Sequence, residues 1–210
     1  MAILTIPEVL DVLIMSLCVG FIFSAYFSRF NTFRKPRDYV QMYGLGKKFN
    51  WSDILFSSLL FAPAIVLHEL GHKFLAIYFG YDATFFSAIS VNKLFHGMPF
   101  LDFPAILMIF AIAASYIKLG FLFFIPAYVS FSALATPFQQ TLIAFAGPLV
   151  NLILWLGSRQ LIKMKKVKQK YIPFAIITSK INMFLFIFNM IPIPGFDGSK
   201  VLLGLISLFS

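Results

Sequence analysis

Val66-Leu67-His68-Glu69-Leu70-Gly71-His72-Lys73 reads H-E-x-x-H and lies inside an apolar run, 54–79, that is long enough to cross a bilayer. Residues four apart share one face of a helix, so His68 and His72 can offer two imidazole nitrogens to one Zn²⁺. Glu69 lies about 100° further round the helix, where it can take a proton from a water at the metal. Ionisable residues are costly in a membrane helix, so this cluster indicates a functional site.

The composition is that of a membrane protein. Of the 210 residues, 60% are hydrophobic and 12% are charged, whereas soluble domains are about 25% charged. We therefore predict an all-α, polytopic integral membrane protein with about four to six membrane-embedded helices and a short re-entrant segment that is compatible with β structure. Cys18 is the single cysteine, so the chain can form no internal disulfide.

The net charge of +9 does not indicate a nucleic-acid partner. The cations concentrate in two short loops, 29–48 and 159–170, which flank apolar runs. The positive-inside rule produces this pattern and places both loops on the cytoplasmic side. The expected surrounding of the chain is therefore a lipid bilayer.

Four spans are expected, and the chain divides into an N-terminal span with its basic loop (1–50) and a core (51–210). The spans are 9–27, 54–79, 139–156 and 173–190. Ser52 or Asp53 is the expected N-cap of the second span, and Pro63 is expected to kink it. Between the second and third spans, alternation at 86–91 weakly favours a strand. Residues 102–135 read as a short helix followed by an extended segment, with a full extra span as the alternative. A short apolar helix is expected at 201–209.

A catalytic zinc needs a third protein ligand, and Asp197 is the best candidate. It follows Pro192, Pro194 and Gly195, so we expect the backbone there not to be a regular helix. Irregular backbone at membrane depth is tolerated where it lines a polar cavity. The alternative is an ordinary exit turn with a surface aspartate.

Asn151 and Asn189 are polar groups in apolar segments, and each has two interpretations. Either side chain could hydrogen-bond across helices, or it could donate to a developing oxyanion or to an extended peptide. Gly147-Pro148 precedes Asn151, and close helix packing is the default explanation for that pair.

Three motifs in this order resemble the site-2 protease family of intramembrane zinc metalloproteases. They are H-E-x-x-H at His68–His72, A-G-P-x-x-N at Ala146–Asn151, and N-x-x-P-x-P-x-x-D-G from Asn189 to Gly198. Phe196 stands where the family usually has Leu, and Ser199 stands where a second Gly is common. The segment between the first two motifs loosely resembles the family's re-entrant β-hairpin, on which an extended substrate would add as a strand.

The resemblance implies one Zn²⁺ per chain, held by His68, His72 and Asp197. It implies Glu69 as the general base and Asn151 as a catalytic residue that orients or stabilises the tetrahedral intermediate. The expected activity is hydrolysis of peptide bonds in or near transmembrane segments, with a transmembrane protein or peptide as the substrate. The alternatives are a membrane transporter or metal-ion carrier, in which the same groups form an ion path, and an inactive protease homologue.

Overall fold

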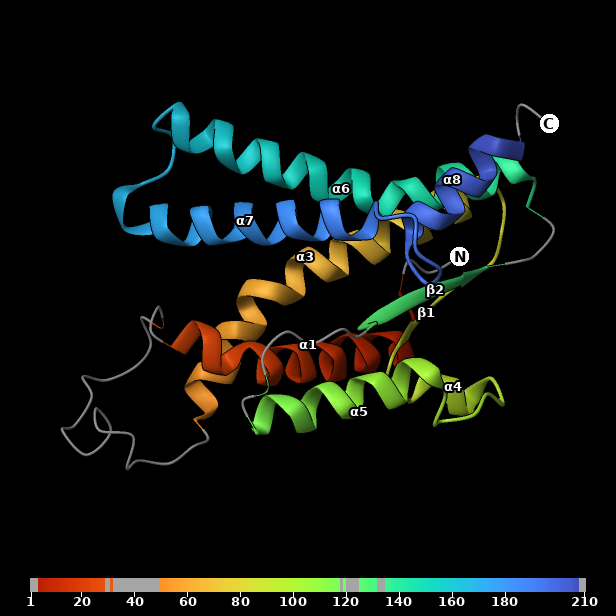
Figure 1. Ribbon diagram of the computed structural model, residues 1–210, viewed down its shortest axis with the longest axis horizontal. Coiled ribbons are helices and arrows are strands. Elements are labelled where there is room, and N and C mark those ends of the chain that lie inside the picture. The colour runs from red at the N-terminus through yellow and green to blue at the C-terminus, as the bar shows by residue number, and fades with distance from the viewer. Residues whose placement is uncertain are drawn as a thin grey trace. The chain divides into compact units, whose positions relative to one another are not determined.

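The computed structural model describes residues 4–28, 31, 50–117, 119, 125–131 and 135–207 (Figure 1). Within this part of the chain, four helices are long and apolar enough to cross a membrane. They are α1 (Ile6–Phe27), α3 (Trp51–Tyr78), α6 (Pro137–Lys163) and α7 (Ile172–Asn189), the last preceded by the single turn η2 (Gln169–Tyr171). The predicted helical, polytopic fold is confirmed. The six cations of the predicted loop 29–48 lie outside the described residues.

The second span begins earlier than predicted, because Asn50 is its N-cap. The Asn50 side-chain oxygen accepts a hydrogen bond from the Ser52 amide at 3.0 Å, and its carbonyl accepts from the Asp53 amide at 3.0 Å. The predicted N-cap at Ser52 or Asp53 is therefore wrong. Asp53 instead accepts a hydrogen bond from the Asn31 amide group at 2.7 Å.

Short elements occupy the region between the second and third spans. They are β1 (Ala83–Ser87), α4 (Asn92–Phe95), α5 (Phe103–Tyr116) and β2 (Ala127–Phe131). Asp102 caps α5 by accepting from the Ala105 amide at 3.0 Å, and β1 pairs with β2 in a two-stranded sheet. A short helix followed by a strand is thus confirmed over a full extra span. The strand predicted at 86–91 lies earlier, at 83–87.

The chain forms two compact units. The site unit consists of Met1–Val9, Pro63–Phe86 and Ala127–Ser210, and the second unit consists of Leu10–Ala62 and Ser87–Pro126. Helix α3 passes from the second unit to the site unit at Pro63. Proline has no amide hydrogen, so the helix lacks one backbone bond there. The predicted division of the chain at residue 50 stays a prediction.

The second unit packs α1 against α5. Its buried cluster comprises Ile22, Ala88, Met108 and Ala111. The Ser115 hydroxyl donates to the Ile22 carbonyl at 2.9 Å, which joins the two helices. The buried Asp11 carboxylate accepts from the Val91 amide at 2.8 Å and so fixes the loop before α4.

The site unit is built on the hairpin of α6 and α7, which run side by side (Figure 1), and α8 (Asp197–Ser207) packs on α6. Between α7 and α8 the chain turns through a non-helical segment, in which Gly195 has a φ of +100°. This segment ends at Phe196, and Asp197 is the first residue of α8. The expectation that Asp197 itself lies on irregular backbone is therefore wrong, although the irregular turn directly precedes it.

Candidate metal centre

Three predicted ligands, from α3 and α8, converge in the site unit. His68 Nε2 lies 3.1 Å from His72 Nε2 and 3.1 Å from Asp197 Oδ2. His72 Nε2 lies 3.3 Å from the same oxygen. The three residues are separated by up to 129 positions in the sequence, so only the fold brings them together.

These distances fit a tetrahedral zinc ion. Protein nitrogen and oxygen ligands lie about 2.0–2.2 Å from zinc, so two ligands of one tetrahedral ion are separated by about 3.3–3.6 Å. The observed separations of 3.1–3.3 Å are close to that value. The donor set of two imidazoles and one carboxylate is also one that catalytic zinc sites use, with a fourth position open.

The other nitrogen of each histidine is held by an oxygen. His68 Nδ1 donates to Asn151 Oδ1 at 2.6 Å, and His72 Nδ1 donates to the Ile143 carbonyl at 2.6 Å. Because the proton is on Nδ1, the lone pair is on Nε2, where a metal ion would be bound. Such partners also fix the orientation of the imidazole rings and raise their basicity.

Two glycines allow α6 to approach the H-E-x-x-H helix. A Cβ at Gly147 would lie 2.3 Å from His72 Nε2 and 2.7 Å from His68 Nε2. Both distances are too short for a Cβ contact, so a side chain there would occupy space beside the two Nε2 atoms that a metal ion needs. On the facing helix, a Cβ at Gly71 would lie 2.9 Å from the Ala146 carbonyl. The glycine of the A-G-P motif thus serves the metal centre as well as helix packing.

Glu69 lies beside the ligands and is 7% exposed. Its side chain faces the charges of Asp197 and Lys200 as well as the His68 imidazole. Within the described part of the chain, its carboxylate accepts no hydrogen bond. A buried carboxylate without such a bond is costly to keep, and its lone pairs are available to a water molecule.

The Asp197 carboxylate is ready to act as a ligand. Its Oδ2 atom faces the Nε2 atoms of both His68 and His72, so an ionised carboxylate, which metal binding requires, would complete the donor set.

Asn151 is fully buried and all three of its described hydrogen bonds are to protein groups. Besides holding a metal-ligand imidazole, its amide group donates to the Ala64 carbonyl at 3.2 Å and to Asn182 Oδ1 at 2.9 Å. Asn182 is also fully buried, and its amide group donates to the Thr178 carbonyl at 2.9 Å. The sequence prediction missed Asn182, although a polar residue in the apolar run 173–190 was the available signal. Asn189 is half-buried at the end of α7.

A buried ion pair adjoins the metal centre. Lys73 follows the ligand His72 and is paired with Glu8, and these two side chains are 3% and 1% exposed. Glu8 also accepts from the Phe85 amide of β1 at 2.7 Å and from the Thr5 amide at 2.7 Å. One carboxylate thus joins the start of α1, the metal-binding part of α3 and strand β1. Glu8 stands in the first turn of α1, and no local pattern in the sequence indicates its pairing with Lys73.

A histidine pair, a carboxylate ligand and a buried glutamate beside them define a metalloprotease type of site. The chain is 31% identical over 155 residues to a protein of Methanocaldococcus jannaschii that is named "Putative zinc metalloprotease", and the match covers 73% of this chain and 73% of that protein. The chain therefore belongs to the metalloprotease family of that protein. No family model matches the chain, and no solved structure matches it. The relationship supports a metalloprotease function and implies a bound metal.

Proposed function

We propose that this protein is an intramembrane zinc metalloprotease of the site-2 protease type, which hydrolyses peptide bonds in or near transmembrane segments. The observation that supports this most strongly is the convergence of His68, His72 and Asp197 beside the buried Glu69. The relative's name supports the protease class, and the order of the three sequence motifs supports the site-2 type.

The depth of the site supports hydrolysis within the bilayer. Gly147, which contacts both imidazoles, lies ten residues after Pro137 and sixteen before Lys163 in α6. At about 1.5 Å per residue, the site is roughly 15 Å and 24 Å from the two ends of that helix. A site at this depth is reached by a membrane-embedded peptide more readily than by a soluble one.

Each residue of the metal centre has a separate role in the proposed hydrolysis. Zinc held by His68, His72 and Asp197 would supply a Lewis acid that polarises the scissile carbonyl and lowers the pKa of a water. Glu69 takes the proton of the attacking water and delivers it to the leaving amine. Asn151 holds the His68 ring in the tautomer and orientation that zinc binding needs. An additional role for Asn151 at the tetrahedral intermediate stays a prediction.

The sheet offers one edge to an extended substrate. On β1, the Phe85 amide donates to Glu8 at 2.7 Å and the Ser87 amide donates to Asp11 at 3.1 Å. The edge of β1 that faces away from β2 is therefore occupied by carboxylates from α1. We propose that the substrate strand adds on the β2 side of the sheet, because carboxylates from α1 occupy the β1 side.

The test is cleavage of a membrane-spanning substrate by the purified protein in liposomes. We expect zinc-dependent cleavage that a chelator abolishes. Glu69→Gln should retain one zinc per chain by elemental analysis but lose cleavage, because the general base is absent. His72→Ala should lose the zinc itself. Turnover by Glu69→Gln at the wild-type rate would contradict the mechanism. Zinc uptake into the liposomes without any cleavage would favour the metal-ion carrier.

A further inference from the structure

The end of α6 and its connection to α7 carry a cluster of positive charge that no described acidic residue pairs with. Six exposed cations lie within twelve residues: Arg159, Lys163, Lys165, Lys166, Lys168 and Lys170. The sequence contains no acidic residue between Asp102 and Asp197. Both of those acids have partners elsewhere, Asp102 in Lys93 and Asp197 in the histidines. Among the described residues, none of the six cations forms an ion pair.

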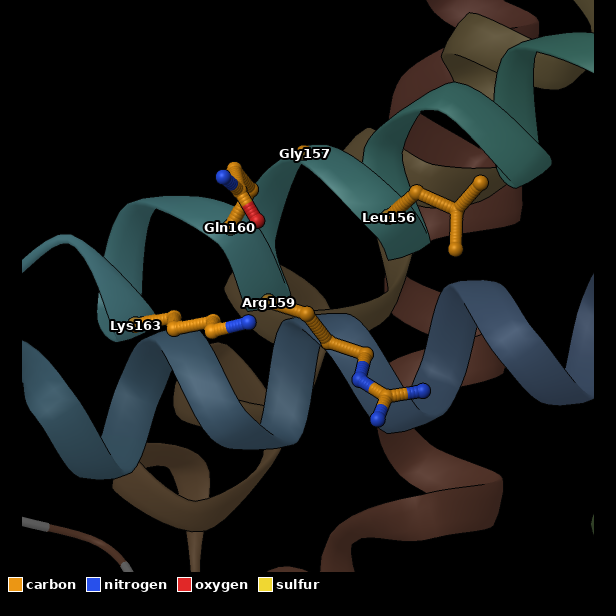
Figure 2. A pocket seen from close by; sticks show the side chains of 5 residues that line it. All are labelled: Leu156, Gly157, Arg159, Gln160 and Lys163. Carbon is orange, nitrogen blue, oxygen red and sulfur yellow. The ribbon is translucent and has the colours of Figure 1, made fainter.

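Two of these cations lie on the span itself and line a pocket. Arg159 and Lys163 are four residues apart on α6, and with Leu156, Gly157 and Gln160 of the same helix they line an open surface pocket of about 610 Å³. Figure 2 shows the Lys163 amine pointing along the helix toward Arg159. Like charges four residues apart on a helix repel each other. An anion that contacts both cations would reverse this repulsion. Helix α6 continues to Lys163, so Arg159 and Lys163 lie on the helix and not in the loop that the sequence predicted from residue 159.

The pocket is polar at one end and apolar at the other. Leu156 lies seven residues before Lys163, which is about 10 Å deeper along the span, and half of its surface is exposed. Next to it, Gly157 leaves open space, since no atom lies within 4 Å of a Cβ placed there. A phosphate group carrying an acyl chain matches this order, whereas a free phosphate would leave the apolar end uncovered.

We propose that this pocket binds the phosphate group of an anionic membrane lipid, which the Arg159 guanidinium and the Lys163 amine contact. Guanidinium groups bind phosphate oxygens through two parallel hydrogen bonds, and lysine adds a point charge. Leu156 and Gly157 receive the start of the acyl chains. The proposal rests on the span and its pocket, and it does not depend on protease activity.

The test is binding of defined lipids to the full-length protein in a neutral detergent, measured by native mass spectrometry and by the thermal unfolding midpoint. The probes are phosphatidylglycerol, phosphatidylcholine and inorganic phosphate at equal phosphate concentration. We expect phosphatidylglycerol to bind and to raise the midpoint, and the other two to do neither. Equal stabilisation by phosphatidylcholine would overturn the proposal, and equal stabilisation by inorganic phosphate would show a free-anion site instead.

A matched pair of double variants locates the site. Arg159→Gln/Lys163→Gln removes two charges from the pocket, and Lys168→Gln/Lys170→Gln removes two from the same connection outside the pocket. We expect the first to weaken phosphatidylglycerol binding about tenfold or more, since it removes both charge-assisted contacts to the phosphate. The second should weaken it less than about threefold by loss of long-range attraction alone. Equal losses would show a diffuse basic surface and refute the pocket. Circular dichroism and zinc content, unchanged in both variants, establish that they are folded.

Discussion

At the scale of a single residue, a substitution of Asn151 can distinguish its support of the His68 imidazole from a direct role at the tetrahedral intermediate. Its side-chain oxygen accepts from His68 Nδ1 at 2.6 Å, and its amide group is bonded to Ala64 and Asn182. We expect Asn151→Ala to weaken zinc affinity about 10–100-fold, the usual effect of losing the partner of a metal-bound histidine. Competition with a chelating dye measures this affinity directly.

The next residue in the same chain of hydrogen bonds provides a graded comparison. Asn182→Ala removes the acceptor of one Asn151 bond but leaves the bond to His68 intact. We expect it to lower zinc affinity in the same direction by a smaller factor. If Asn151 acted only on the reacting peptide, both variants would bind zinc as the wild type does and only the turnover number would fall.

A second prediction at the residue scale concerns the close packing of Gly147 against the two imidazoles. A methyl group there would lie 2.3 Å from His72 Nε2 and must displace the imidazole or the metal. We expect Gly147→Ala to reduce zinc content to a small fraction of one per chain. Gly157→Ala, in the same helix but facing open space, is the control. It should keep its zinc, and it should stabilise the helix by about 0.5–1 kcal/mol. Full zinc occupancy in Gly147→Ala would contradict the observed packing.

The sequence predicted the members of the metal centre better than their supports. His68, Glu69 and His72 share a recognisable local spacing, and Asp197 stands in a segment rich in proline and glycine. Asn182 has no local pattern around it, because its importance comes from an oxygen on another helix. The pairing of Glu8 with Lys73 crosses 65 positions and was likewise hidden.

At the scale of elements, the Glu8–Lys73 pair joins α1, α3 and β1. Breaking this pair is expected to lower the stability of the protein. Glu8→Gln leaves the Lys73 charge buried without a partner, which typically costs about 3–5 kcal/mol. We expect a marked fall in the thermal unfolding midpoint. The double variant Glu8→Gln/Lys73→Met removes the orphaned charge and should recover much of this loss. A double variant less stable than Glu8→Gln would show that the loss does not come from the unpaired charge.

The sequence prediction placed element boundaries wrongly where individual hydrogen bonds, and not hydropathy, decide them. The start of α3 depends on the Asn50 side chain, which binds the Ser52 amide two residues ahead. The bounds of β1, 83–87, are set by its pairing with β2, which lies 40 residues further along the chain and leaves no local signal near β1. By contrast, the start of α5 was predicted, since Asp102 followed by a proline is a strong local signal.

At the scale of the whole molecule, hydropathy alone identified the four helices that are long enough to span, because each is a continuous apolar segment. It could not predict which helices meet at the site. That depends on the glycines of α3 and α6 and on the turn that brings α8 back against α6. Helix α8, at 11 residues, is too short to span and still carries a ligand. Under the proposed function, a site formed by α3, α6 and α8 would receive its substrate as a membrane-embedded chain.

This arrangement leads to a prediction about the substrate of the proposed protease. The amides of a transmembrane helix are hydrogen-bonded, so the helix must unwind before a peptide bond can reach Glu69 and the metal ligands. An Ala→Gly change near the scissile bond weakens the helix by about 1 kcal/mol, and so should raise kcat/KM about fivefold. The same change two turns or more away is the control and should have little effect, because that part of the helix need not open. Single-turnover cleavage in liposomes measures both. Equal rates for substrates that differ at the scissile site would mean that unwinding does not limit cleavage.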